Sequence, residues 1–348
     1  MSLPFRYQPS RGFFASHFCD TSKGTCRIGR RHWLLALAGV VAAWPSPGRA
    51  QPRPAATIGV LVIGAPGWDR FWRVFRESMR DIGYVEGQSV RYEFRSDEGQ
   101  SSRLPELAQE LVRLKVDVIV TWYTPPAQAA KRATGDIPIV MALAGNPVET
   151  GLVASLDHPG GNVTGMAGAA AELSRKTVEL TRELLPSAHR FVALANAADP
   201  FSKPFVEYIR EGGVATRTVI DAKMIRDATE LEASFDQMAK DRPDAIIVQP
   251  SLPRRKVAEL AMIHRIPAVS VIHGFVEEGG LMTYAPAEVE IYRRAAAIVD
   301  KILKGAKPSE LPVEQPTKFE LLINMRTAKA LGLTIPPPLL VRADVVLD

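Results

Sequence analysis

The chain has 348 residues, of which 46% are hydrophobic, 7% aromatic and 23% charged, and these values exclude a disordered, collagen-like or disulfide-stapled protein. The formal net charge of +5 is concentrated at the N-terminus: residues 1–50 hold seven Lys and Arg against one acid, whereas residues 51–348 hold 36 against 37. Because a duplex-binding protein needs a concentrated basic patch in its folded part, the charge gives no support for nucleic-acid binding.

Residues 1–50 have the layout of an export signal. Arg30 and Arg31 precede an apolar run over residues 33–44, which is followed by prolines and by a small-x-Ala end at residues 48–50. The run is too short to anchor the chain in a bilayer, which takes about 20 residues. The paired arginines resemble the twin-arginine type, and an ordinary Sec signal is the alternative. Both predict cleavage and a periplasmic protein without stable membrane insertion.

The two cysteines, Cys19 and Cys26, both lie in or before this signal. The mature chain would therefore contain no cysteine, so it would use neither disulfides nor thiol catalysis.

The rest of the chain alternates short β-rich runs with helical patterns. The runs are continuously apolar, as expected for parallel strands covered on both faces. We predict strands at 57–63, 116–121, 137–143, 190–196, 245–248 and 266–272. Apolar residues at helical spacing predict helices at 71–82, 104–114, 171–184, 203–211, 228–239, 254–263 and 288–304. Phe75, Phe235 and Ile263 are interpreted as core residues within these helices.

Repeated β-α units predict an α/β protein with parallel sheets, and the roughly 300 residues after the signal suit two doubly wound lobes. Signatures of catalysis are missing: the sequence contains no phosphate-binding glycine loop, no nucleophile elbow and no histidine pair at helical spacing. We therefore expect no enzyme activity, no metal and no cofactor.

Polar and aromatic residues follow the predicted strands, and ligands of open α/β sheets bind at the carboxyl ends of the strands. Thr124 is expected to cap a helix with Pro125 at its first position, so that free N–H groups favour an anion there. The candidate ligand-binding residues at strand ends are Trp68, Asp69, Trp122, Tyr123, Thr124, Gln128, Asn146, Asn196, Asp199, Gln249, His273 and Phe275.

Several longer motifs then resemble one known family. They are Tyr84-Val-Glu-Gly-Gln88, Asn146-Pro-Val148 with Gly151-Leu-Val153, Pro159-Gly-Gly-Asn-Val-Thr-Gly165, Gly279-Gly-Leu-Met-Thr-Tyr284, Lys301-Ile-Leu-Lys-Gly305, Leu311-Pro-Val-Glu-Gln-Pro-Thr-Lys-Phe-Glu-Leu321 and Ala328-Lys-Ala-Leu-Gly-Leu333. Over residues 57–335 the chain resembles ABC-transporter substrate-binding proteins, in the branch that includes tryptophan- and tyrosine-binding members.

The resemblance implies a type I periplasmic-binding fold, in which two α/β lobes joined by three crossovers close on a small ligand. It implies lobe one at 55–163 plus 282–312 and lobe two at 164–281 plus 313–335, followed by an extended tail at 336–348. Hinge strands are expected near Val163–Gly165 and Gly280–Thr283. The implied partners are a small-molecule ligand and the membrane subunits of an ABC permease, and the protein is expected to be a monomer.

Departures from the family pattern bear on the ligand. Aromatic amino-acid binders of the family carry Asp at the position of Asn146, and a Thr-Asp-Asn-like segment where this chain has Gln249-Pro-Ser251. Because an ammonium group favours a carboxylate partner, these amides predict weak binding of amino acids and better binding of acids or neutral ring compounds.

The rings of Trp68, Trp122, Tyr123, Phe275 and Tyr284 are expected to sandwich a planar or aromatic ligand, and the alternative is that some only pack under the loops. Replacing Trp122 by Ala should then weaken binding by ~2 kcal/mol with little loss of folding.

Three other functions are alternatives to solute capture for a permease. A ligand-sensing repressor would need a DNA-binding segment where this chain has the export signal, and an exported hydrolase would need a catalytic constellation. A binding protein that partners a sensor kinase or passive carrier would share every feature named above.

Overall fold

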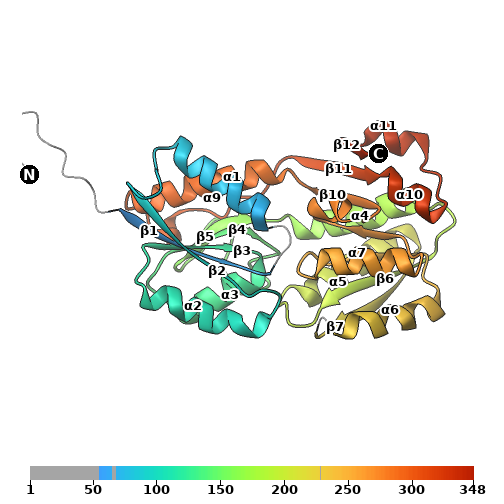
Figure 1. Cartoon of the computed structure of the whole chain (residues 1–348), viewed down its shortest axis with the longest axis horizontal. Helices are drawn as coiled ribbons and strands as arrows, with labels where there is room; N and C mark the ends of the chain where they lie inside the picture. The colour runs from blue at the N-terminus through green and yellow to red at the C-terminus, as the bar shows by residue number, and fades with distance from the viewer. Residues whose placement is uncertain (1–54, 65–67, 228) are drawn as a thin grey trace, which may run out of the picture. The chain divides into compact units, whose positions relative to one another are not determined.

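The structure is a computed structural model that describes residues 55–64, 68–227 and 229–348. The expected export signal lies outside the described residues. Residues Pro52–Asp348 form one compact unit, which contains two separate β-sheets, each with helices on both faces (Figure 1).

The first sheet is entirely parallel, in the order β2-β1-β3-β4-β5. Its strands are β1 (Ala56–Val62), β2 (Val90–Ser96), β3 (Val118–Trp122), β4 (Ile139–Ala144) and β5 (Val163–Ala167). The second sheet has the order β12-β11-β10-β9-β8-β6-β7, in which β11 runs antiparallel to β10. Its strands are β6 (Arg190–Asn196), β7 (Val219–Ile225), β8 (Ala245–Val248), β9 (Ala268–Ser270), β10 (Met282–Pro286), β11 (Phe319–Asn324) and β12 (Val345–Leu347).

Helices α1 and α9 pack together on one face of the first sheet, and α2 and α3 on the other (Figure 1). This lobe, lobe one, contains α1 (Trp68–Asp81), η2 (Ser101–Arg103), α2 (Leu104–Arg113), α3 (Thr124–Ala133), α9 (Glu288–Leu303) and η3 (Pro308–Glu310). Lobe two contains α4 (Ala170–Leu184), α5 (Ser202–Thr216), α6 (Glu230–Asp241), α7 (Arg254–Ile263), α8 (Gly274–Glu277), α10 (Met325–Leu331) and α11 (Pro337–Arg342).

The continuous apolar runs form strands because both of their faces are covered. In β6, Val192 and Leu194 pack with residues of α6 and α7, whereas Ala193 and Ala195 pack with residues of α4 and α5. Successive side chains of a strand point to opposite faces, so a strand between two helical layers must be apolar at every position. The α/β prediction with two parallel-sheet lobes is confirmed.

Three expected boundaries are corrected. Strand β5 hydrogen-bonds to β4 and therefore belongs to lobe one, and β10 lies between β9 and β11 and therefore belongs to lobe two. The expected extended tail instead forms α11 and then β12, which pairs with β11, and Leu339 is buried in the core of lobe two. Ile263, expected in the core, is the last residue of α7 and is 71% exposed.

The chain passes between the lobes after β5, after β10 and before β11. The first and third crossings are hydrogen-bonded together, since the Ala167 N–H donates to the Glu314 carbonyl and the Glu314 N–H donates to the Gly165 carbonyl. Gly165 has a φ of +132°, and a Cβ there would lie 2.2 Å from the Met141 carbonyl oxygen, so only glycine fits. The expected hinge at Gly280–Thr283 lies inside lobe two, and the second crossing is at Ala287, whose N–H donates to the Lys318 carbonyl.

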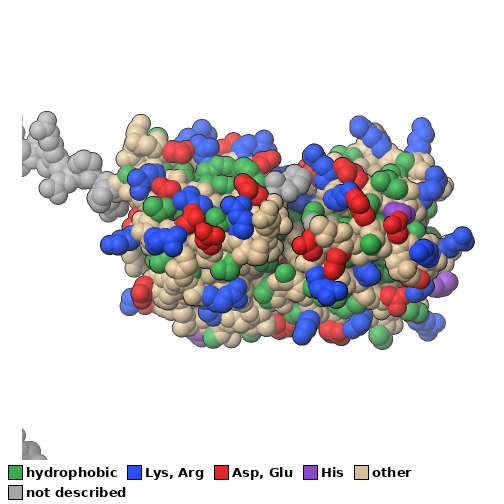
Figure 2. All heavy atoms as spheres, turned by 60° about the horizontal axis from the view of Figure 1, so that its bottom comes forward, with side chains coloured by type: hydrophobic (Ala, Val, Ile, Leu, Met, Phe, Trp, Pro, Cys, Tyr) green, Lys and Arg blue, Asp and Glu red, His purple; other side chains and the backbone are tan. Residues whose placement is uncertain are grey.

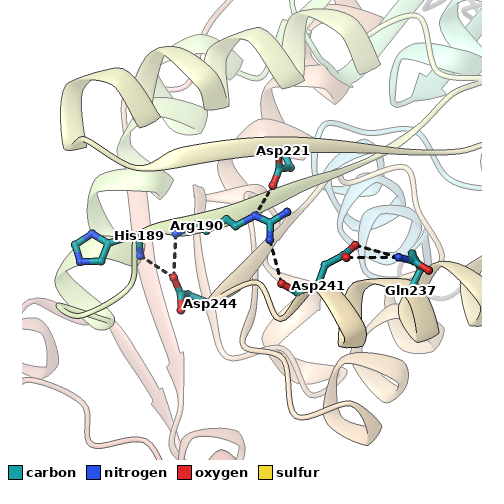
Figure 3. A network of polar contacts seen from close by, with 6 residues as sticks. All are labelled: His189, Arg190, Asp221, Gln237, Asp241 and Asp244. Carbon is teal, nitrogen blue, oxygen red and sulfur yellow. Dashed lines mark hydrogen bonds and ion pairs between the residues drawn. The ribbon is translucent and has the colours of Figure 1, made fainter.

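The amino ends of the strands of lobe two are joined by a polar network (Figure 3). Asp244 Oδ2 accepts hydrogen bonds from the backbone N–H groups of His189 and Arg190, at 2.7 and 2.9 Å. The Arg190 guanidinium donates to Asp221 on β7 and to the Asp241 carbonyl at the end of α6. These contacts connect β6, β7 and β8 at the end opposite to the carboxyl ends of the strands, so this network has a structural role.

Candidate functional site

The carboxyl ends of strands from both sheets surround a small cavity of about 50 Å³, here called the inner chamber. Its lining comes from both lobes and from the crossings between them. The lining residues are Tyr123, Thr124, Leu143, Ala144, Gly145, Gly168, Ala170, Leu173, Ser174, Asp199, Phe201, Pro250, Ser251, Val271, Ile272 and Pro286.

A larger space of about 990 Å³, here called the outer groove, adjoins the chamber and shares Tyr123, Pro250 and Ser251 with it. Lobe one contributes Ile63, Gly64, residues 97–102, Leu104, Pro105, Trp122, Tyr123, Pro125, Gln128 and Arg132, and lobe two contributes Asn196, Ala198, Pro200, residues 225–227 and residues 250–254. Binding sites for small molecules have this concave form and this mixture of apolar walls with a few polar groups.

Tyr123 lies where the chamber meets the groove, immediately after β3. Its backbone has φ 76° and ψ 171°, a region that is costly for any residue except glycine. The side chain is 6% exposed, and its hydroxyl has no hydrogen-bond partner among the residues described. Burial raises the pKa of this phenol far above its usual range, so at neutral pH it keeps its proton. A strained backbone therefore holds Tyr123, with its buried and unpartnered hydroxyl, in the wall of the cavity.

Asp199, Gln249 and Asn196 form one buried network at the ends of β6 and β8. Gln249 donates from Nε2 to Asp199 Oδ2 at 2.9 Å, and its Oε1 accepts the Asn196 N–H at 2.7 Å. Asp199 Oδ1 accepts the Phe201 N–H at 2.9 Å. Burial raises the Asp199 pKa to about 6, although the nearby Ser251 hydroxyl and the Phe201 N–H favour the ionised form. Of these side chains, only the Asp199 carboxylate lines the inner chamber.

A second buried cluster connects the lobes behind the groove. The Trp122 ring is 1% exposed and stacks on Phe71 at 6.0 Å between centroids, and its Nε1 donates to the Tyr292 hydroxyl. From lobe two, the Arg254 guanidinium lies 5.7 Å from the centroid of the Trp122 ring. Burial raises the pKa of Glu288, at the start of α9, to about 7, against the opposing charges of Arg254 and Arg70.

Other contacts also cross between the lobes. Arg70 Nη1 of α1 lies 3.0 Å from Glu277 Oε1 of α8. The Tyr208 hydroxyl of α5 donates to Glu149 Oε1 and accepts from Asn146 Nδ2, both at 2.6 Å. The Phe201 ring lies so close to Gly145 that a Cβ there would be 2.5 Å from it. The lobes thus contact each other at several separate places.

The structure brings together only part of the predicted set. The residues that line the chamber or the groove are Trp122, Tyr123, Thr124, Gln128, Asn196 and Asp199. The remaining residues line neither space: Trp68, Asp69, Asn146, Gln249, His273, Phe275 and Tyr284.

The predicted residues that line neither space are held elsewhere by packing and polar contacts. Phe275 is fully buried and Gly280 fits against its ring, so this side chain belongs to the core. Trp68 packs on Phe94 at 4.7 Å between centroids, and Tyr284 stacks on Phe319 at 5.9 Å. His273 lies 2.9 Å from Glu320, and burial lowers its pKa to about 4, which keeps the imidazole neutral. Asp69 is exposed in the first turn of α1.

The expected anion site at the start of α3 is corrected. The helix begins at Thr124, with Tyr123 as the N-cap, and the Thr124 hydroxyl accepts the Gly145 N–H instead of capping the helix. Proline has no N–H, so Pro125 and Pro126 remove two of the donors that a helix start offers. Little of the anion-binding capacity predicted for α3 remains.

Sequence reasoning missed the start of α4, which lines the chamber through Gly168, Ala170, Leu173 and Ser174. The N-cap is Ala169, in the left-handed region with φ 49°, and no side chain caps this helix. One feature of the sequence could have indicated this uncapped helix start. Residues 169–171 are all alanine, at a place where a helix normally begins with Ser, Thr, Asp or Asn. Its N–H groups are left for another acceptor.

In the part of the chain that the structure describes, no group of three or more His, Cys, Asp or Glu residues is placed to hold a metal ion. No described helix is both long enough and apolar enough to span a membrane. On the face shown in Figure 2, Lys and Arg side chains are interspersed with Asp and Glu over both lobes.

Comparison with known proteins gives consistent matches. A family model described as ABC transporter substrate binding protein matches residues 57–347. A tyrosine-binding protein of Clostridioides difficile (strain R20291) is 28% identical over 291 residues, which are 82% of this chain and 83% of that protein. A solved ABC domain from Streptococcus pneumoniae in complex with L-Trp is 28% identical, with a TM-score of 0.78, over 84% of this chain and 100% of that one. A conserved domain protein from Vibrio cholerae is 25% identical, with a TM-score of 0.79 and the same coverage.

Proposed function

The chain belongs to the family of ABC transporter substrate-binding proteins, and from this premise we propose that it captures a small, ring-bearing solute between its lobes and delivers it to an ABC permease. The observation that carries this proposal is the inner chamber. It lies at the carboxyl ends of strands from both sheets, which is where α/β proteins bind ligands. Its buried, unpartnered Tyr123 hydroxyl supports a polar ligand group at this place.

We propose aromatic amino acids as the ligand class. One relative is a tyrosine-binding protein and one similar domain was solved with L-Trp. Weak amino-acid binding was expected because Asn146 and the segment Gln249-Pro-Ser251 stand where the family has acids. Asn146 and Gln249 line neither the chamber nor the groove, whereas Pro250 and Ser251 line both. The carboxylate at the chamber is Asp199, and it can serve as the partner of an ammonium group.

Capture would occur by closure of the lobes about the three crossings. Strands β5 and β10 lead directly into two of these crossings, so rotation about the backbone there would move one sheet edge relative to the other. The contacts Arg70–Glu277 and Tyr208–Glu149 would form on closure and break on opening. The solute would be released chemically unchanged, because the family consists of binding proteins.

We also propose that the mature protein is a periplasmic monomer exported through the signal at residues 1–50. The support comes from the arginine pair Arg30-Arg31, the apolar run after it and the small-x-Ala end. Delivery to a permease requires a location outside the cytoplasm, which agrees with this signal.

A thermal-shift screen of residues 51–348 tests the proposed function. Amino acids, aromatic acids, nucleosides and sugars would each be added in excess, since a ligand at 100 times its dissociation constant stabilises the folded state by ~2.7 kcal/mol. We expect L-tryptophan or L-tyrosine to raise the melting temperature by several degrees. If no small solute of any class stabilises the protein, the proposal of solute capture is wrong.

A further inference from the structure

We propose that Arg254 is a latch residue for the closed form of the protein: its side chain extends from lobe two to lobe one, where the Trp122 ring and the charge of Glu288 hold it. The latch favours closure whether or not a solute is bound. This inference rests on the closure of the lobes under the proposed function, and it adds which residues determine how much of the ligand-free protein is closed.

The position of Arg254 is the first observation behind the latch. It is the first residue of α7 in lobe two, and it is only 6% exposed, although arginine is almost never buried without a partner. Its guanidinium lies 5.7 Å from the centroid of the Trp122 ring, at the end of β3 in lobe one. A cation over an indole face is attracted more strongly when both groups are removed from water. Because opening separates the two groups, this contact favours the closed form.

The start of α8 leaves space for this arginine. Gly274 is the first residue of α8, and a Cβ at this position would collide with Nη1 of Arg254. A helical backbone does not itself require glycine, so the reason for glycine at this position is the space that the guanidinium occupies. The Arg254 side chain is thus confined between α8 of its own lobe and the Trp122 ring of the other lobe.

Glu288 supplies the opposite charge from lobe one. It is the first residue of α9, directly after the crossing at Ala287, and it is 5% exposed. Arg70 Nε of the same lobe lies 3.8 Å from Glu288 Oε2, and the positive charge of Arg254 acts on Glu288 from lobe two. Opening would withdraw Arg254 and leave Arg70 in place. A buried carboxylate that loses a compensating charge is costly, so the interaction between Arg254 and Glu288 also favours closure.

The burial of Glu288 makes the latch depend on pH. The charged or titratable groups that act on Glu288 are Arg70 of α1, Arg254 of α7, Glu277 of α8, Tyr292 of α9 and Tyr123 after β3. Burial raises the pKa of Glu288 from 4.5 to about 7, in spite of the two arginines. Opening exposes this carboxyl to water and returns its pKa toward 4.5, so between these two values the closed form retains a proton that the open form releases. A falling pH therefore favours closure, and the charge of Arg254 matters most above pH 7, where the buried carboxylate is ionised.

The test measures closure in residues 51–348 without ligand, so that the identity of the solute does not enter. This part of the chain contains no cysteine, so spin labels can be placed at cysteines introduced by Gln109→Cys on α2 and Gln237→Cys on α6. Both positions are exposed, and they belong to different lobes. Double electron–electron resonance at pH 8 and pH 5.5 would then give the ratio of closed to open protein.

The variants separate the parts of the latch. Arg254→Met removes the charge but keeps an unbranched apolar side chain, and Gly274→Ala displaces the guanidinium without removing its charge. Each would be compared with the wild type, and Arg254→Met would also be measured in a Glu288→Gln background. The matched control is Arg342→Met, which removes an exposed ion pair with Glu183 inside lobe two. Thermal unfolding of each variant would establish that it is folded.

We expect part of the ligand-free wild type to be closed, and this part to increase from pH 8 to pH 5.5. Arg254→Met should lower the ratio of closed to open protein at least about 10-fold at pH 8, because both the ring contact and the compensating charge are lost. The loss should be smaller at pH 5.5, and in the Glu288→Gln background it should be the same at both pH values. Gly274→Ala should lower the ratio at pH 8, and Arg342→Met should leave it unchanged.

The latch is overturned if Arg254→Met leaves the ratio unchanged at pH 8, or if the ligand-free wild type is open at both pH values. The role of Glu288 is overturned if the effect of Arg254→Met is equally large at pH 8 and pH 5.5. None of these results bears on the thermal-shift screen, which separately decides whether the protein captures a solute.

Discussion

Gln249 donates a hydrogen bond of 2.9 Å to the Asp199 carboxylate, and the same amide accepts the Asn196 N–H through its oxygen. The sequence analysis expected Asp199, Gln249 and Asn196 all to contact the ligand, but the structure places them at different distances from the chamber. Asp199 lines the chamber, Gln249 is fully buried behind it, and Asn196 lines the groove. Gln249 therefore positions the Asp199 side chain beside the chamber.

Replacing Gln249 by Met should destabilise the fold. The substitution keeps the volume but leaves the Asn196 N–H and one Asp199 oxygen without their partner, which costs about 1–3 kcal/mol in the free energy of unfolding. Urea denaturation of the two proteins measures this difference. A conservative control is Gln237→Met on the exposed face of α6, which should change stability little. Equal midpoints for Gln249→Met and the wild type would contradict the role given to this amide.

Asp199 should make ligand binding depend on pH. With a pKa of about 6 in the free protein, its carboxylate is ionised at pH 7.5 and protonated at pH 5. The affinity for an ammonium-bearing ligand should therefore fall as the pH decreases through 6, approaching about tenfold per pH unit below it. Calorimetric titrations between pH 5 and 8 measure this change, and Asp199→Asn should show no such step.

The same pKa has a consequence for the stability of the ligand-free protein. The carboxyl has an ordinary pKa of 3.8, which folding raises, so between about pH 4 and 6 the folded chain retains a proton that the unfolded chain has released. The unfolding free energy should decrease with rising pH in this window, relative to Asp199→Asn. If the difference between the two proteins does not vary with pH, Asp199 is not perturbed by burial in this way.

Trp122→Ala should damage the fold as well as the site. Its ring is 1% exposed and packs on Phe71 and Tyr123, so its removal leaves a cavity and is expected to cost about 3–5 kcal/mol of stability. This corrects the expectation that the variant would lose binding with little loss of folding. The half-buried Trp68 is the matched control, because its replacement by Ala should cost less. Similar urea midpoints for the wild type and Trp122→Ala would show that the ring is not a core residue.

Export should depend on the arginine pair if the signal is of the twin-arginine type. Replacing Arg30 and Arg31 by Lys keeps the charge but removes that motif, so the periplasmic species starting near Gln51 should disappear from cell fractions. Arg27→Lys with Arg49→Lys is the matched control and should leave export intact. Unchanged export of the Arg30 and Arg31 variant would assign the signal to the Sec route, and a full-length cytoplasmic wild type would contradict export altogether.

Most of the interior strands could be predicted from the sequence, whereas the edge strands β2, β7 and β12 and the interior strand β11 could not. The predicted bounds of β6 and β8 agree with the structure at both ends, because strands covered on both faces are continuously apolar. Strands β2 and β7 are both edge strands, and most of their side chains are half-buried or exposed. Their mixed polar and apolar residues give no continuous run, so they were missed.

The position of the site could be predicted better than its lining. Tyr123 and Asp199 follow strands, and the rule that ligands bind at strand ends finds them. The same rule wrongly included Phe275, because the sequence does not show whether a ring after a strand points to the ligand or into the core. Ser174 was missed because it lies in the second turn of a helix, where a serine normally bonds to its own backbone. Only the three-dimensional structure reveals its unpartnered hydroxyl.

The most direct test of the central claim is calorimetric titration of residues 51–348 with L-tryptophan and with L-tyrosine at pH 7.5, followed by mass spectrometry of the recovered ligand. We predict saturable binding of at least one of them at one site per chain, and recovery of that ligand chemically unchanged. The absence of binding by both amino acids would contradict the assignment of the chamber to aromatic amino acids, and recovery of a chemically altered ligand would contradict the account of the protein as a binding protein.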